Sequence, residues 1–251
     1  MIIRPRPHGW QLLYILRGSI VPAVAPKVLA ILLLAIAVSA VVELGNVPGM
    51  ERVSSAPFAL LGLVLSIFLS FRNNACHERW WEGRKLWGQL IFESRSLARQ
   101  VQQLLPDDAP RRTRIGHLAI AFAHGLAARL RGADEAQAAR RWLDADQHVL
   151  LHDRRNTLDA LLSMIAAELA VPLHAGRLSP ILYAQLEERL HALSSIQAGC
   201  ERILATPLPF AYTLLLHRCA WLFCVLLPFG LASSLGWATP VLSAVLAYAF
   251  F

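Results

Sequence analysis

Residues 57–87 constrain the fold more than any other stretch, because their two halves have opposite character. Residues 57–71 carry no charged side chain, whereas residues 72–85 are rich in charge and contain two adjacent tryptophans. The uncharged half corresponds to about 22 Å of helix, which is short for a membrane span unless the helix continues through Asn73 and Asn74. Charged and aromatic residues directly after an apolar run are typical of a membrane boundary. The stretch therefore predicts a membrane helix that continues into water.

The uncharged half contains a helical face of large apolar residues. Leu63, Ile67 and Phe71 are spaced four residues apart and lie on one face of a helix, beside a small polar stripe of Ser66 and Ser70. Such a face suits a helix that packs closely on other helices, or one that lines a narrow constriction gated by dewetting. A buried helix whose large residues belong to the core has the same periodicity, and periodicity alone favours that interpretation.

The composition requires membrane segments. Hydrophobic residues make up 56% and charged residues 16% of the 251 residues, against a usual charged share of about 25%. The formal net charge is +7, but residues 72–205 mix both signs, and the sequence has no zinc-finger spacing, RNP motif or lysine-rich tail. A solvated helical surface explains this charge better than nucleic-acid binding does.

Three motifs resemble the signatures of one family. They are NNACHERWWEGRKLWG at residues 73–88, RGSI at residues 17–20 followed by Pro22 and Pro26, and TPLPFAY at residues 206–212. In these motifs the chain resembles the bestrophin family, most closely its bacterial branch. The resemblance covers most of residues 4–251 and is weaker across residues 100–175.

The resemblance implies an all-α fold and a homopentameric ion channel in which the second membrane helix of each subunit lines a central pore. It places the family's hydrophobic neck on Leu63, Ile67 and Phe71, the face that the spacing singles out. It also implies a second constriction at the cytoplasmic exit, for which Ile181 is the matching residue. The alternative for Ile181 is a core position at the start of a helix.

The resemblance leaves the sign of the conducted ion open. Animal bestrophins are chloride channels, whereas the bacterial branch is associated with monovalent cations such as sodium, so the greater similarity to that branch favours cations. An apolar neck controls hydration and not sign, so charges in the cytoplasmic vestibule would decide. The alternatives are an anion channel of the same architecture, a membrane-anchored helical scaffold without transport, and a membrane enzyme with an unfamiliar site.

Four membrane helices and a helical cytoplasmic body are expected. The segments are a cytoplasmic N-terminal segment at 1–27, membrane helix 1 at 28–44, the pore-lining membrane helix 2 at 57–74, a helical cytoplasmic region at 75–205, membrane helix 3 at 207–235 and the start of membrane helix 4 at 239–251. Pro228 is expected to kink or end the third helix. Residues 239–251 are too few to span, and bestrophins continue further, so the sequence is expected to be part of a longer chain.

Basic residues set the expected orientation. The N-terminal segment carries Arg4, Arg6, Arg17 and Lys27 without an acidic residue, and the 75–205 region is also rich in arginine. The positive-inside rule then places both termini and the helical body in the cytoplasm, with the bacterial inner membrane as the membrane. Arg218 is expected to mark the cytoplasmic boundary of the third membrane helix.

The cytoplasmic region has helical periodicity and no sustained strand-like alternation. Prolines and glycines separate its periodic segments. Helices are expected near residues 84–105, 111–131, 134–149, 155–174 and 179–204.

No motif predicts an enzyme, a cofactor or a metal site. The sequence has no HExxH, P-loop or GxGxxG motif, so no catalytic residue is assigned. His117 and His124 could share a helix face, but without a carboxylate partner they predict packed or surface histidines. His77 and Glu78 could hold a metal at a subunit contact.

Ion pairing is the simpler use of the charges around Glu78, and it predicts a collar beneath the membrane. The members of this collar are Glu78, Glu82, Arg72, Arg79 and Arg84. The four cysteines have no CxxC spacing and are expected to be reduced structural thiols.

The uncharged runs 28–42 and 57–71 of the first two spans hold no Asp, Glu, Lys, Arg or His, and His217 and Arg218 stand near the edge of the third. Coupled transporters usually need such groups inside the bilayer. A passive pore in the lipid bilayer, permeated by monovalent ions, is therefore favoured over a pump.

Overall fold

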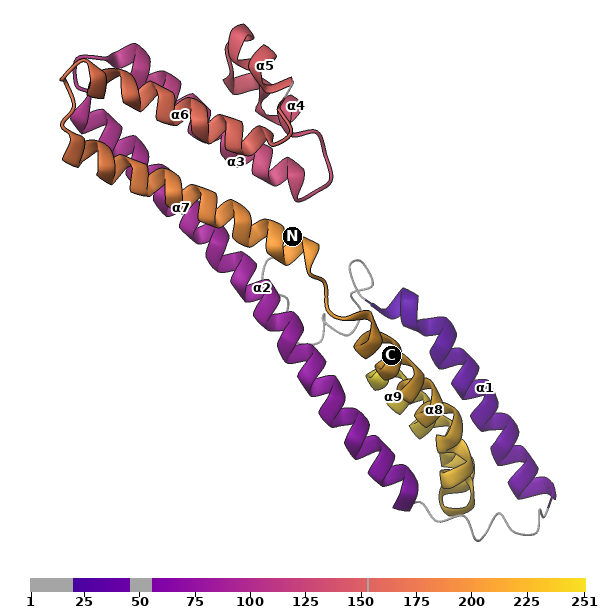
Figure 1. The fold of residues 1–251 in the computed structure, drawn as a ribbon. Helices are drawn as coiled ribbons and strands as arrows, with labels where there is room; N and C mark the ends of the chain where they lie inside the picture. The colour runs from indigo at the N-terminus through magenta and orange to yellow at the C-terminus, as the bar shows by residue number, and fades with distance from the viewer. Residues whose placement is uncertain (1–19, 46–55, 153) are drawn as a thin grey trace, which may run out of the picture. The chain divides into compact units, whose positions relative to one another are not determined.

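The computed structural model describes residues 20–45, 56–152 and 154–251, and within these ranges the chain is helical, with no β-strand (Figure 1). Most of the expected N-terminal segment 1–27 lies outside the described residues. The helices are α1 (Val21–Gly45), α2 (Ala56–Leu104), α3 (Ala109–Arg129), α4 (Glu135–Ala139), η3 (Arg140–Trp142), α5 (Ala145–His152), α6 (Thr157–His174), α7 (Pro180–Ala205), α8 (Phe210–Leu235), η4 (Gly236–Ala238) and α9 (Thr239–Phe250).

The chain divides into two compact units. The first holds α1, the part of α2 as far as Ala75, α8, η4 and α9. The second, Cys76–Pro207, holds the rest of α2 together with α3 to α7.

In the first unit, α1, α8 and α9 pack on one another, and α2 contributes Leu65 to their apolar core. The buried side chains of this core are Ile31, Leu65, Leu216, Ala220, Phe223, Cys224, Leu227 and Ala247. Glycines bring α2 and α8 close together, because a Cβ on Gly62 would lie 3.2 Å from the Phe223 ring. A Cβ on Gly230 would overlap the Phe58 ring. Small residues at helix contacts are typical of membrane helices.

Two membrane helices differ from expectation at their prolines. Helix α1 begins at Val21, ahead of residue 28, because Pro22 stands in its first turn, where a missing N–H breaks no hydrogen bond. Helix α8 continues through Pro228 to Leu235, so the possible helix end at that proline is wrong.

In the second unit, α3, α6, α7 and the last part of α2 enclose a second apolar core. Fully buried large side chains come from all four helices, including Leu97, Phe122, Leu126, Ile165, Leu169, Leu186 and Leu193. Helix α6 is long and apolar enough to cross a membrane by length and composition, as are α1, α2 and the α8–α9 stretch. Its apolar residues are nevertheless accounted for by this core, in which Leu161, Ile165 and Leu169 are fully buried.

The helices expected at 111–131, 155–174 and 179–204 correspond to α3, α6 and α7, with ends shifted by one or two residues. The single helix expected at 134–149 is wrong. Helix α4 ends at Ala139, and after η3 the backbone of Leu143 is extended (φ −116°, ψ 142°) before α5 begins. Trp142 explains the break, because its ring packs against those of His117 and His124 on α3.

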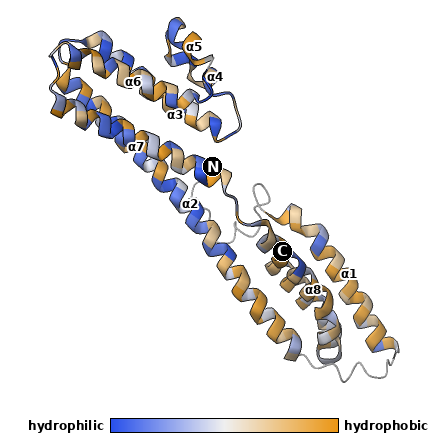
Figure 2. Cartoon of the chain, viewed as in Figure 1, coloured by the Kyte–Doolittle hydropathy of each residue, from blue (hydrophilic) through white to orange (hydrophobic). Residues whose placement is uncertain are grey.

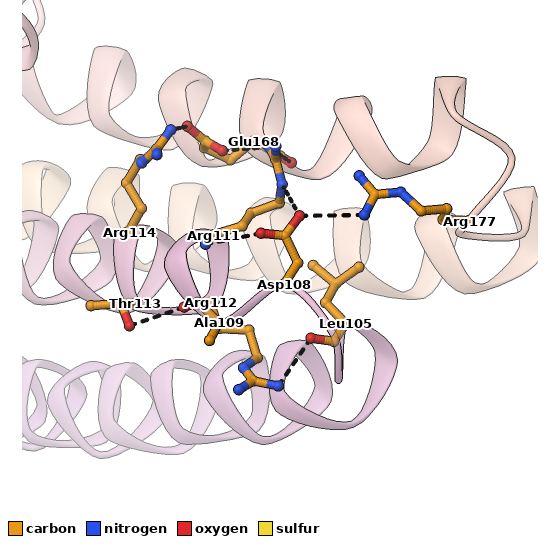
Figure 3. A network of polar contacts seen from close by, with 9 residues as sticks. All are labelled: Leu105, Asp108, Ala109, Arg111, Arg112, Thr113, Arg114, Glu168 and Arg177. Carbon is orange, nitrogen blue, oxygen red and sulfur yellow. Dashed lines mark hydrogen bonds and ion pairs between the residues drawn. The ribbon is translucent and has the colours of Figure 1, made fainter.

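A network of charges fixes the start of α3 (Figure 3). The Asp108 carboxylate caps α3 by accepting from the backbone N–H of Arg111 at 3.3 Å, and it pairs with the Arg111 guanidinium at 3.0 Å. Arg111 also pairs with Glu168 of α6 at 2.5 Å, and Arg114 binds the same carboxylate at 2.8 Å. The hydrogen bond from the Arg111 side chain holds the pKa of Asp108 below its ordinary value. The network ties the first turn of α3 to α6.

Arg129, the last residue of α3, joins three further elements. Its guanidinium pairs with Glu135 of α4 at 2.5 Å and with Glu201 of α7. It also donates to Oδ1 of Asn156, the N-cap of α6, at 3.0 Å. The hydrogen bond to Glu135 raises the pKa of Arg129 above its ordinary value, so this cation stays charged at all relevant pH values.

Candidate functional site: the exposed apolar face of helix α2

Helix α2 is one continuous helix of 49 residues, about 74 Å long at 1.5 Å per residue. Figure 2 shows that its hydropathy changes along its length, from predominantly hydrophobic at the N-terminal end to predominantly hydrophilic further along. The helix passes through Asn73 and Asn74 without a break. The predicted continuation of the apolar stretch into a polar helix is therefore confirmed.

One face of the apolar part of α2 packs within the chain. Leu65 is buried in the core with Phe223 of α8, Leu69 packs against that core, and Gly62 lies against the Phe223 ring. Phe58 approaches Gly230 of α8. The spacing of these α2 residues, three or four apart, places them on one side of the helix.

Leu63, Ile67 and Phe71 lie on the opposite side of α2. At about 100° per residue, their mean direction is roughly 170° from that of the packed face. Their side chains are 59%, 48% and 66% exposed. The interpretation of these residues as ordinary core of one chain is therefore wrong. The neighbouring Ser66 donates its hydroxyl to the Gly62 carbonyl at 2.8 Å, so this hydroxyl is satisfied within the helix.

The same face continues along α2 into polar residues that the sequence analysis did not assign to it. The spacing of three and four residues leads from Phe71 to Asn74 and then to Glu78, and both side chains are exposed. Glu78 makes no ion pair with any other described residue. Extending the spacing of the apolar face by two turns would have found both residues.

The predicted collar of local ion pairs is wrong. Glu82 pairs with Arg202 of α7 and not with a neighbour on its own helix. The Arg79 guanidinium donates to the carbonyl oxygens of Thr206 and, at 2.6 Å, Ile203. Arg79 thereby supplies donors to carbonyl groups at the C-terminal end of α7, which lack partners within the helix.

Ile181 lies in the second unit, in the first turn of α7, directly after the Ser179 N-cap and Pro180. Its side chain is 76% exposed, so the alternative of a core residue at a helix start is wrong. Its predicted role at the cytoplasmic exit stays a prediction.

The histidines and cysteines that the sequence singles out do not form a metal site among the described residues. His117 and His124 flank the Trp142 ring at centroid distances of 5.8 and 6.0 Å. Among the residues that the structure describes, no three His, Cys, Asp or Glu side chains come together in a way that could hold a metal ion. The four cysteines are free thiols, and burial raises the pKa of the Cys200 thiol.

The family model that matches the chain is described as "Bacterial/Fungal Bestrophin protein", and it covers residues 1–251. Two similar named relatives are voltage-dependent anion channel-forming proteins. The protein mll4386 of Mesorhizobium japonicum is 44% identical over 252 residues, which cover 100% of this chain and 80% of the relative. YneE of Escherichia coli strain K12 is 40% identical over 250 residues, which cover 100% of this chain and 82% of the relative.

Solved structures with the same fold include a bacterial bestrophin homologue from Klebsiella pneumoniae. It has a TM-score of 0.83 and 34% identity, covering 89% of this chain and 83% of that one. A single-residue variant of the Klebsiella homologue has a TM-score of 0.87 at 34% identity, covering 93% of this chain and 85% of that one. Because the family model matches the whole chain and close relatives cover it completely, the chain belongs to the bestrophin family, in its bacterial and fungal group.

Proposed function

We propose that the protein is a passive ion channel of the bacterial plasma membrane, with a pore lined by α2 from several copies of the chain. The observation that carries the proposal is the exposed apolar face of Leu63, Ile67 and Phe71, on the side of α2 opposite its packing within the chain. The relatives are named voltage-dependent anion channel-forming proteins, and these names support a channel. One chain cannot enclose a pore with a single helix face, so the proposal includes a homopentamer, as the family resemblance implies.

In this channel Leu63, Ile67 and Phe71 form the neck. Consecutive neck residues are separated by four positions, or about 6 Å along the helix axis. Rings of these side chains from the five subunits would make a short apolar constriction, which admits ions only when it is hydrated. Ile181 is proposed as the second constriction, at the cytoplasmic exit, and its exposure supports that role.

We propose that both termini and the Cys76–Pro207 unit lie in the cytoplasm. The support is the distribution of basic residues, which are abundant in residues 72–205 and scarce in residues 229–240.

The proposed permeant ions are monovalent cations such as sodium, and this part of the proposal rests on Glu78. Its exposed carboxylate follows the neck on the same face of α2, and a ring of carboxylates favours cations. The names of the relatives favour the second candidate, an anion channel of the same architecture.

Planar-bilayer recording of the purified, oligomeric protein under a NaCl gradient tests the proposal. We expect a current above protein-free controls, with a reversal potential near the sodium equilibrium potential. A reversal near the chloride equilibrium potential would establish the anion channel. The absence of current from intact oligomers would contradict the channel and favour a membrane-anchored scaffold.

A further inference from the structure

The two flanks of α2, on either side of the neck face, differ in the size of their side chains. At about 100° per residue, Val64 and Phe68 lie roughly 80° to one side of the mean direction of the neck residues. Ser66 and Ser70 lie roughly 80° to the other side. Val64 and Phe68 are 49% and 41% exposed, and both serines are exposed. Helix α2 therefore has a large flank, Val64 and Phe68, and a small flank, Ser66 and Ser70.

The large flank carries an apolar groove of about 420 Å³ between α2 and α8. Phe68 and Phe71 line its α2 side, and Tyr212 and Leu215 line its α8 side. All four side chains are exposed, so the chain itself leaves the groove open. Of the described residues that line it, only Arg72 is charged. An open apolar groove of this kind is typical of an interaction site.

The small flank can approach another helix closely. Ser66 donates its hydroxyl to the Gly62 carbonyl at 2.8 Å, so this side chain needs no hydrogen-bond partner outside its own helix. Ala59, two turns before Ser66, extends the flank with another small side chain. Small residues of this kind let the backbones of membrane helices come close together. Residues 57–71 carry no charge, so covering this flank buries no charged group.

Under the proposed function, on which this placement rests, the neck face of every α2 points to a central axis. Each copy in such a ring turns one flank to the next copy and the other flank to the preceding copy, so the contact joins two different surfaces. The large flank of one α2 then faces the small flank of the neighbouring α2. Equivalent residues lie at the same level along the axis, so the level of Phe68 is about 3 Å from those of Ser66 and Ser70 of the partner subunit.

We propose that the groove between α2 and α8 receives α2 of a neighbouring copy of this chain, with Phe68 packed between Ser66 and Ser70 of the partner subunit. The large ring lies at the level of the gap between two small side chains, and the apolar groove meets an uncharged helix. Phe71 lines the groove and belongs to the proposed neck. The seated helix therefore sets the spacing of neighbouring α2 helices at the neck, and Phe68 is a positioning residue of the channel.

Disulfide cross-linking of the purified full chain tests the contact. Phe68→Cys together with Ser70→Cys places one thiol on each flank, in a background in which Cys76→Ser removes an exposed native thiol. Two residues apart on a helix, the new thiols point away from each other and cannot bridge within one chain. Oxidation should give a ladder of covalent oligomers up to the pentamer on a non-reducing gel.

Val64→Cys together with Phe68→Cys is the matched control, because it places both thiols on the large flank. This pair should give no cross-linked species. Cross-linked dimers from this pair alone would overturn the proposal, because they would show two large flanks facing each other across a two-fold contact. An absence of cross-links from both pairs, in variants that keep the oligomer size of the wild type, would overturn it in favour of lipid at the groove.

Ser66→Leu tests the match of sizes without oxidation. The larger side chain overpacks the contact, so the concentration at which half of the chains are assembled should rise by roughly tenfold. Sedimentation of the detergent-solubilised protein measures that concentration, and circular dichroism checks that the helices are intact. Ser66→Ala keeps the flank small and should assemble as the wild type does. Equal assembly of the Ser66→Leu and Ser66→Ala variants would overturn the contact at this flank.

Planar-bilayer recording distinguishes failure of the contact from failure of the channel. A Phe68–Ser70 ladder from a protein that passes no current would support the contact and contradict the proposed function. A current from a protein that gives no ladder would support the channel and overturn the contact.

Discussion

The carboxylate of Asp108 stabilises the protein in two ways. It caps α3, and it forms an ion pair with Arg111, which also pairs with Glu168. The roles can be separated by substitution. Asparagine is as good an N-cap as aspartate but carries no charge. Asp108→Asn therefore removes the ion pair and keeps the cap.

We expect Asp108→Asn to lower the thermal unfolding midpoint of the detergent-solubilised protein at pH 7. Because the folded pKa of Asp108 lies below its ordinary value of 3.8, the charge stabilises the fold above that pH. The stabilisation is lost as the pH falls through the folded pKa. The difference between wild type and variant should shrink on acidification below pH 4, and a difference that is constant with pH would contradict this account.

The proposed preference for cations depends on the carboxylate of Glu78. Glu78→Gln keeps the size of the side chain and removes its charge, so the ratio of sodium to chloride permeability should fall by roughly threefold. Reversal potentials under a NaCl gradient measure the ratio. Glu188→Gln, at an exposed glutamate of α7 whose side chain is 72% exposed, is the control. An unchanged ratio in Glu78→Gln would remove Glu78 from the ion pathway.

Two glycines of helix α3, Gly125 and Gly116, allow a matched test of how α3 packs against α6. A Cβ on Gly125 would lie 2.8 Å from Leu158 Cδ2, whereas a Cβ on Gly116 would meet nothing within 4 Å. Gly125→Ala should destabilise the protein by about 1–3 kcal/mol through overpacking. Gly116→Ala should be neutral or stabilise it by up to about 1 kcal/mol, because alanine is the better helix former.

Thermal unfolding of both alanine variants, under the same conditions, gives the comparison. A Gly125→Ala protein as stable as Gly116→Ala would show that Leu158 moves aside without cost, and that α3 and α6 are packed less tightly than the structure indicates.

Elements with strong periodicity could be predicted from the sequence, and those decided by single tertiary contacts could not. The spacing of Leu63, Ile67 and Phe71 identified a helix face, although periodicity could not tell a buried face from an exposed one. The break at Leu143 depends on how Trp142 meets α3, which no local pattern contains. The partner of Glu82 lies on α7, 120 residues away in sequence, so local spacing suggested the wrong pairs.

The whole molecule consists of an apolar unit and a charged helical unit, and the long helix α2 belongs to both. The first unit buries one face of α2 and leaves the opposite face exposed. In a membrane protein, an exposed face of large apolar residues contacts lipid, a neighbouring subunit or a pore. The proposed pentamer assigns it to the pore.

The conductance of the variant with alanine at Leu63, Ile67 and Phe71 tests this assignment most directly. Alanine widens the constriction and lowers the cost of hydrating it. Single-channel recording should therefore give a larger conductance or a higher open probability than in the wild type, from oligomers of unchanged size. Unchanged conductance in a correctly assembled triple variant would contradict the account, because lipid-facing residues can be shortened without changing a pore.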